Sequence, residues 1–268
     1  MAQLKGPILF TGSVGGIRAY YNKTLKRYVV STKGGSTKEI INNNPTMERQ
    51  RENMSEFKGC TKMASQLRRA LDSISHLRQG YYFSQLVALA KLIQKQDDEG
   101  IKGTRSILLS KYSRLLLSFN FNQLHPFDQV FAQRYEVSFS EDKRTVTLKL
   151  PELKSASRIY WPSGFEAYRI ALVIVQQPDW TWNLEGKRFE PVVKNLELKT
   201  VTTFSGWRSR NTVPEDIVLT ATFEEAALQL PGTTVVVAMG IEVSAYQLDT
   251  FVINTTGVGT MKIVECFV

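Results

Sequence analysis

The sequence predicts an α+β protein that consists of an N-terminal β-hairpin arm, a short helical segment and a C-terminal antiparallel, immunoglobulin-like β-sandwich. Two observations predict this order. Apolar residues follow a helical period between residues 46 and 96, and alternating β-branched or aromatic runs lie on either side of that stretch. The expected boundaries are 1–41 for the arm, 42–131 for the helical segment and 132–268 for the sandwich.

The arm is predicted as a small β-unit over residues 7–33. Residues 17–21 and 28–32 are two alternating runs, and the polar residues 22–27 form the loop between them. A hairpin of this size buries little surface on its own. We therefore expect it to dock on its own body or on a neighbouring subunit.

The helical segment begins after the linker at residues 42–45. Gly59 is expected to divide two helices, and Gly80 is expected to end the second one. Residues 81–96 predict a third and more apolar helix. Residues 105–131 fit either a strand or a helix, and both alternatives remain open.

The last part of the chain is rich in β-strand patterns. Residues 135–150 form two alternating runs around a polar turn at 141–144, as in a hairpin. Further strands are expected at 168–176, 188–193, 197–204, 217–223, 233–247 and 260–267. Because no helical pattern separates these runs, the sequence favours an antiparallel sandwich over a parallel sheet.

The charge of the chain is unevenly distributed. The protein has 34 Lys+Arg and 25 Asp+Glu, a net charge of +9. Residues 1–118 hold 20 basic and 8 acidic side chains (+12), and residues 119–268 hold 14 and 17 (−3). All of the positive excess therefore lies in the first 118 residues, which suits contact with an acidic partner or with nucleic acid.

Localisation and redox signals are sparse. The first ten residues lack the apolar segment of a secretory signal, and no apolar run is long enough to span a membrane. The two cysteines do not make a disulfide framework. We expect a protein made in the cytoplasm without a signal peptide, and the final location of any assembly stays open.

No pattern for catalysis or cofactor binding stands out. The glycines at 12–16 lack the spacing of a phosphate-binding loop, so a tight turn is favoured there. His76 and His125 are far apart, and neither has a second ligand at metal-binding spacing. We therefore expect no catalytic residue, no metal site and no cofactor, and we expect a protein that is not an enzyme.

The basic N-terminal residues are interleaved with tyrosines. Cations beside aromatic rings can follow a phosphate backbone and stack on bases. The same residues equally suit a soluble basic surface or the acidic face of another subunit. The candidate contacts for nucleic acid or an acidic partner are Arg18, Lys23, Lys26, Arg27, Lys33 and Lys38.

Four short motifs carry a resemblance to a known group. They are GSVGGI at 12–17, STKGG at 31–35, RxRxNMxEFxGC at 49–60 and MGIE at 239–242. With them the chain resembles a family common in Bacteroidota that has no established activity, cofactor or catalytic residue. The resemblance implies a bacterial source and the order β-unit, helices, β-sandwich. The loop at 23–27 departs from the family pattern in being more basic.

These observations favour a non-enzymatic subunit that assembles with itself into a filament, a tube or a virion-like shell. Its N-terminal β-arm would link the subunits by adding a strand to a neighbour's sheet. The residues expected at this interface are Ile8, Phe10, Ile17, Tyr20, Tyr28 and Val30. One alternative is a nucleic-acid-binding accessory protein that uses the basic half. Another is a carbohydrate- or protein-binding sandwich that uses Trp161, Trp180, Trp182 and Trp207.

Overall fold

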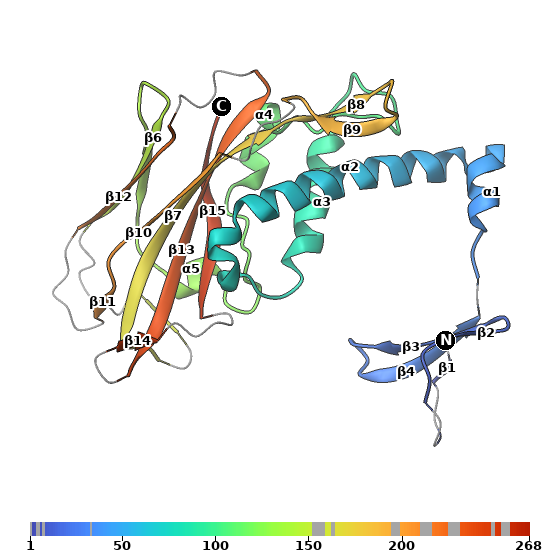
Figure 1. Cartoon of the computed structure of the whole chain (residues 1–268), viewed down its shortest axis with the longest axis horizontal. Helices are drawn as coiled ribbons and strands as arrows, with labels where there is room; N and C mark the ends of the chain where they lie inside the picture. Colours follow the sequence, from blue (N-terminus) through green and yellow to red (C-terminus); the bar gives the residue numbers. More distant parts are fainter. Residues whose placement is uncertain are drawn as a thin grey trace. The chain divides into compact units, whose positions relative to one another are not determined.

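The structure is a computed structural model (Figure 1). It describes residues 2–3, 6, 9–32, 34–151, 159–161, 164–193, 199–209, 216–224, 231–247, 250–252 and 258–268. The chain divides into two compact units, Met1–Arg51 and Glu52–Val268. Helices and antiparallel sheets are both present, which confirms the prediction of an α+β protein.

The first unit contains a four-stranded antiparallel sheet followed by short helices. Its strands lie in the order β1-β4-β3-β2. They are β1 (Ala2–Gln3), β2 (Gly12–Val14), β3 (Ile17–Asn22) and β4 (Arg27–Thr32). The helices are α1 (Lys38–Asn43), which Thr37 caps by accepting a hydrogen bond from the Ile40 amide, and the 3-10 turn η1 (Pro45–Met47).

The second unit is built around a six-stranded sheet. Its central strands, β7 (Ala167–Pro178) and β13 (Thr233–Gln247), pair from Thr233 opposite Pro178 to Ser244 opposite Ala167. The other strands are β10 (Thr200–Phe204) and β11 (Arg208–Ser209) beside β7, and β14 (Thr250–Val252) and β15 (Gly259–Phe267) beside β13.

Two smaller sheets complete the β structure. The three-stranded sheet has the order β12-β6-β5 and consists of β5 (Glu136–Phe139), β6 (Thr145–Leu150) and β12 (Ile217–Thr222). The predicted hairpin at 135–150 corresponds to β5 and β6, which pair antiparallel. A separate two-stranded hairpin is formed by β8 (Trp180–Asn183) and β9 (Arg188–Pro191).

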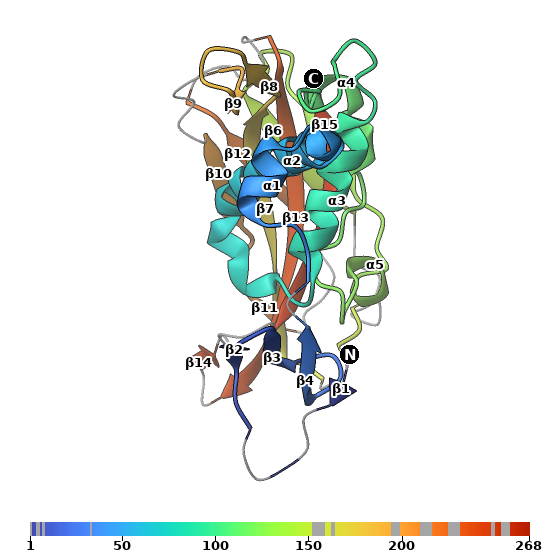
Figure 2. The same cartoon turned by 90° about the vertical axis from the view of Figure 1, so that its right-hand side faces the viewer.

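The second unit has three layers, with helices, the six-stranded sheet and the three-stranded sheet stacked in that order (Figures 1 and 2). Along β7, Ala171, Val173 and Val175 pack with the helices. Their neighbours, such as Leu172 and Ile174, pack against the three-stranded sheet. Because both faces of β7 are covered, its sequence reads as a continuous apolar run rather than as an alternation.

The helical layer is formed mainly by two helices and a turn between them. They are α2 (Glu48–Ala70), the 3-10 turn η2 (Asp72–Leu77) and α3 (Tyr82–Gln94). The expectation that Gly59 divides two helices is wrong, because α2 runs through this position. A Cβ at Gly59 would lie 2.6 Å from Cγ of Phe189, so the glycine lets the helix approach the β8–β9 hairpin closely.

Residues 105–131 are mostly irregular, with short helical turns. These are α4 (Leu109–Tyr112), η3 (Ser113–Leu116) and α5 (Phe127–Val130). Between them the chain runs beside β15, where the Phe121 amide donates to the Met261 carbonyl and the Ile263 amide donates to the Phe119 carbonyl. This contact with a distant strand determines the conformation that the local sequence left open.

Within the described part of the chain, no helix combines the length and the apolar character that crossing a membrane requires.

Candidate functional site

The N-terminal sheet has two faces of different chemistry. The pairing places Ile17 opposite Thr32, Ala19 opposite Val30, and Tyr21 opposite Tyr28, and Val14 of β2 lies opposite Ile17. Because side chains alternate along a strand, these residues share one face. That face is largely apolar.

Much of this apolar face is exposed. Val14 is 67% exposed, Ile17 is 48% exposed and Tyr21 is 46% exposed. The rings of Tyr21 and Tyr28 meet edge to face, with their centroids 5.2 Å apart. Among the described residues of this unit, Ala19 and Val29 are the only buried apolar side chains. The unit thus presents more apolar surface than it covers.

The opposite face is mostly polar and basic, apart from the buried Val29. Arg18, Tyr20 and Arg27 lie on it, and the Arg18 guanidinium carbon is 5.7 Å from the centroid of the Tyr20 ring. Tyr20 therefore does not join the other residues expected at the assembly interface. Ile17, Tyr28 and Val30 do share one face.

The remaining predicted site residues lie elsewhere in this unit. Phe10 precedes β2 and is 37% exposed. Lys23 and Lys26 lie in the turn between β3 and β4, and Lys38 is the first residue of α1. The basic residues are therefore spread over a face, a turn and a helix. Ile8 and Lys33 lie outside the described residues.

The edges of this sheet are short. The strands at the two edges, β1 and β2, have two and three residues. Short edge strands offer few unpaired backbone groups for the addition of a neighbour's strand. The apolar face is the larger surface available for contact with a partner.

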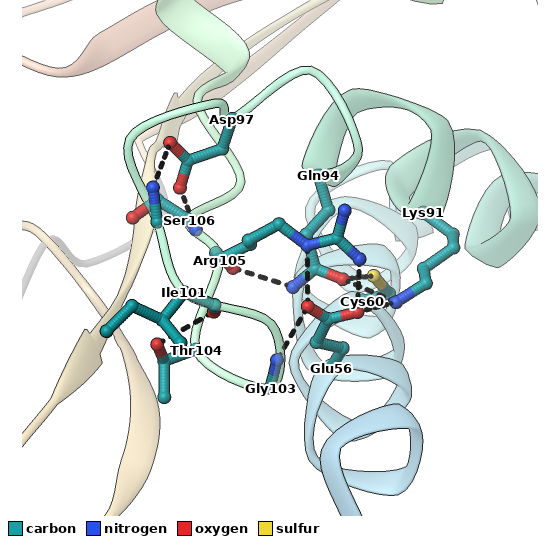
Figure 3. Close-up of polar contacts among 11 residues, drawn as sticks. Glu56, Cys60, Lys91, Gln94, Asp97, Ile101, Gly103, Thr104, Arg105 and Ser106 are labelled. Atoms are coloured by element: carbon teal, nitrogen blue, oxygen red, sulfur yellow. Dashed lines mark hydrogen bonds and ion pairs between the residues drawn. The ribbon is translucent and has the colours of Figure 1, made fainter. Parts of the chain in front are cut away.

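A buried ion network lies in the second unit, between α2, α3 and the loop after α3 (Figure 3). Glu56 of α2 is 1% exposed. Its Oε1 accepts hydrogen bonds from the Gly103 amide at 2.9 Å and from Arg105 Nε at 2.7 Å, and its Oε2 accepts from Arg105 Nη2 at 2.8 Å and from Lys91 Nζ. Each oxygen of the Glu56 carboxylate thus accepts two hydrogen bonds.

The network continues through Gln94 on α3. Its Oε1 accepts from Lys91 Nζ at 3.0 Å and from Cys60 Sγ at 3.3 Å, and its Nε2 donates to the Arg105 carbonyl at 2.8 Å. Asp97 holds the same loop by accepting from the amides of Gly100 and Ser106. These bonds join two helices to a loop that has little regular structure.

The ionisation of this network fits a structural role. Burial would raise the pKa of Glu56, but hydrogen bonds from Arg105, Lys91 and the Gly103 amide outweigh it and lower the pKa from 4.5 to about 2. Burial raises the pKa of the Cys60 thiol to about 12. The carboxylate is therefore a poor base and the thiol a poor nucleophile, so this constellation is suited to holding the fold.

The two histidines have different partners. His76 Nε2 lies 2.9 Å from Oε1 of the buried Glu242, whose other oxygen accepts from Arg169 Nε at 2.6 Å. The His125 ring packs beside Trp161, with centroids 4.7 Å apart. Over the residues that the structure describes, no group of three or more His, Cys, Asp or Glu side chains is arranged to hold a metal ion.

The tryptophans of the sugar-binding alternative do not gather in one place. Trp180 is 8% exposed, and its indole Nε1 donates to Gln66 at 2.9 Å. Trp182 packs edge to face with Phe189. The Arg169 guanidinium lies over Trp207, with its carbon 4.8 Å from the centroid of the ring. Most of their surface is used in packing within the chain.

Sequence reasoning missed the Glu56 network, although the sequence carries a signal for it. Glu56 precedes Cys60 by four residues and Met63 by seven, so it lies on the apolar stripe of α2. A carboxylate on a buried stripe requires cationic partners, because an unpaired buried charge is costly. Its partners Lys91 and Arg105 are 35 and 49 residues away and have no sequence spacing that identifies them.

No known protein family, curated protein or solved structure matches this chain.

Proposed function

We propose that this protein is a non-enzymatic structural subunit that assembles with itself into a filament, a tube or a virion-like shell, linked through its N-terminal β-unit. The observation that carries this proposal is the exposed apolar face around Ile17, Tyr21 and Tyr28. A small sheet with so little covered surface gains stability when a partner covers it.

The charge of the N-terminal unit favours a particular kind of contact. Residues 1–51 contain nine Lys+Arg and two Asp+Glu, a net charge of 9 − 2 = +7. Two such units repel each other when their like faces meet. The remaining residues carry 25 Lys+Arg and 23 Asp+Glu, a net charge of +2. Contact between the N-terminal unit of one copy and the second unit of the next therefore meets less charge repulsion than contact between two N-terminal units.

An arm-to-body contact is heterologous, since each copy uses two different surfaces. Such contacts generate rings when the rotation closes and open filaments when it does not. In this proposal the two stacked sheets of residues 132–268 serve as an immunoglobulin-like sandwich that receives the arm. The short edge strands favour docking by the apolar face over simple strand addition.

Deletion of residues 1–35 tests the proposal. Full-length protein at high concentration is expected to elute as a large species in size-exclusion chromatography and to form regular particles or filaments in negative-stain electron microscopy. The truncated protein is expected to elute as a monomer with an unchanged circular dichroism spectrum in the helical region. Monomeric full-length protein, or a truncated protein that still assembles, contradicts the proposal.

The alternative is a nucleic-acid-binding accessory protein that uses Arg18, Lys23, Lys26, Arg27, Lys33 and Lys38. Among the described members of this set, Lys23, Lys26 and Arg27 lie at the β3–β4 turn, whereas Arg18 lies at the other end of β3 and Lys38 lies on α1. We take this division as favouring assembly as the role of the N-terminal unit. A gel shift of DNA or RNA at low salt that is lost on reversing the charges of Lys23 and Lys26 would support the alternative instead.

A further inference from the structure

A groove of about 850 Å³ lies between α2 and the β8–β9 hairpin of the second unit. Figure 1 shows the hairpin alongside the helix. A second hollow of about 220 Å³ is lined partly by the same residues, among them Lys58, Lys62 and Arg188. The combined space is in the range of ligand-binding clefts.

The walls of this groove are fixed by packing and hydrogen bonds. Phe189 of β9 is 3% exposed and packs on the helix at Gly59. The Phe189 carbonyl accepts a hydrogen bond from Lys62 Nζ at 3.1 Å, and Gln66 accepts one from Trp180 Nε1 at 2.9 Å. The groove is therefore formed before any ligand arrives.

Positive charge dominates the groove. Lys58, Lys62 and Arg69 line it from α2, at spacings of four and seven residues that keep them on one side of the helix. From the hairpin, Arg188 lines both spaces and Lys187 lines the smaller hollow. Among the described residues that line the groove, Glu190 is the only acidic one, and its carboxylate accepts hydrogen bonds from Arg188 Nε at 2.5 Å and from Asn183 at 2.8 Å.

Aromatic and hydroxyl groups lie among these cations. Phe57 lines the larger space and is 58% exposed, and the half-buried Trp182 lines the smaller one. The Ser55 hydroxyl, also in the smaller hollow, is buried and has no hydrogen-bond partner in the described part of the protein.

We propose that the groove binds single-stranded nucleic acid. The cations of α2 and the hairpin contact phosphates, and Phe57 stacks on a base. This combination of a basic channel and an exposed aromatic ring is the one used for sequence-tolerant single-strand binding, with sites of about four nucleotides or more. The stretch of α2 from Lys58 to Arg69 spans about 16 Å, which suits the shortest of these sites.

Binding of fluorescein-labelled oligothymidylate to the full-length protein tests this site by fluorescence anisotropy. With about four phosphate contacts, affinity is expected to fall about 50-fold between 50 and 200 mM salt. The double variant K58E/R69E is expected to bind at least tenfold more weakly. The matched control K95E/K102E reverses two exposed lysines outside the groove and is expected to change affinity less than threefold.

Phe57 has a separate test because it carries no charge. Phe57→Ala is expected to weaken binding by roughly fivefold or more, since stacking on one base contributes about 1 kcal/mol or more. Tyr81→Ala removes an aromatic ring that is 72% exposed and lies outside the groove, and it is expected to leave affinity unchanged. Thermal melting checks that all variants are folded.

Four outcomes overturn the proposal. The first is that no oligothymidylate binds at 50 mM salt. The second is that K58E/R69E and K95E/K102E weaken binding equally, which indicates nonspecific electrostatic attraction. The third is loss of binding in K23E/K26E with the groove variant unaffected, which places the contact in the N-terminal unit. The fourth is competition by a polyglutamate peptide as effective as by unlabelled oligothymidylate, which identifies an acidic protein segment as the occupant. These binding measurements are independent of whether the protein assembles with itself.

Discussion

The guanidinium group of Arg105 donates two hydrogen bonds to the Glu56 carboxylate, from Nε at 2.7 Å and from Nη2 at 2.8 Å. Such two-point contacts are strong and directional. Here the contact fixes an irregular loop to α2, and Lys91 adds a third element by bonding to the same carboxylate. The Glu56 carboxylate thus joins the loop to both α2 and α3.

Replacement of this residue is expected to destabilise the protein. Glu56→Gln leaves two cations near a neutral amide in a buried site, and the loss of one partner of a buried ion pair costs about 3–5 kcal/mol. The free energy of unfolding from urea titration measures this cost. Glu99→Gln, an exposed carboxylate beside the same loop, is the matched control and is expected to change stability by less than about 0.5 kcal/mol. Equal effects of the two changes contradict the structural role of Glu56.

The same carboxylate makes stability depend on pH. Its pKa is about 2 in the folded protein and 4.5 ordinarily, so its contribution of about 3 kcal/mol is complete above pH 4.5 and is lost as the pH falls toward 2. Gln does not titrate. The difference in unfolding free energy between wild type and Glu56→Gln is therefore expected to shrink by about 2 kcal/mol between pH 7 and pH 3. A constant difference over this range would show that Glu56 is not held ionised by its partners.

Gly59 is expected to resist substitution although it lies in a helix. Alanine favours helix by about 1 kcal/mol over glycine. Its Cβ, however, would lie 2.6 and 2.7 Å from two carbons of the buried Phe189 ring, and such overpacking typically costs about 1–3 kcal/mol. Gly59→Ala should therefore lower the unfolding free energy. The cost should fall when Phe189→Leu is also present, and additive effects in this double-mutant cycle would contradict the close approach.

The two faces of the N-terminal sheet are expected to differ in their effect on assembly. The variant I17D/Y28D places two charges on the apolar face and should abolish large species in analytical ultracentrifugation. The control N22D/S31D places two charges on the polar face and should assemble as the wild type does. Loss of assembly in both variants would indicate that added negative charge on either face prevents assembly. Assembly of both variants would show that the apolar face is not the interface.

Both cysteines are expected to react slowly in the folded protein. Burial raises the pKa of Cys60 and of Cys266 to about 12, so at pH 8 the thiolate fraction is about a thousandfold below that of an ordinary thiol. Iodoacetamide labelling followed by mass spectrometry should show little modification in buffer and complete modification in urea. Rapid labelling of Cys60 in buffer would contradict its burial.

The sequence predicted the strands well where the pattern is local. The expected strand at 233–247 coincides with β13, and the expected hairpin at 135–150 contains β5 and β6. Residues 105–131 could not be predicted because several of their backbone hydrogen bonds join them to segments that are distant in the chain, as between Phe121 and Met261 of β15 and between Ile107 and Trp180. The prediction for Gly59 was wrong because its role depends on Phe189, which is 130 residues away in sequence.

The groove and the Glu56 network escaped prediction for the same reason. Lys58 and Arg188 meet only when the β8–β9 hairpin reaches α2, and Glu56 meets Arg105 only when the loop closes. The faces of the N-terminal sheet, by contrast, follow from strand alternation. Ile17 and Tyr20 are three positions apart on β3, so alternation alone places their side chains on opposite faces.

The double-sided burial of the six-stranded sheet has a consequence for biosynthesis. Helices α2 and α3 leave the ribosome before β7, and β13 and β15 follow much later, yet all five pack in one core. The apolar faces of the helices therefore stay without their covering strands for most of translation. Proteins with such long-range pairing fold slowly, and their intermediates expose apolar surface that makes them prone to aggregate. We therefore expect the yield of folded protein to depend on chaperones that bind the nascent chain.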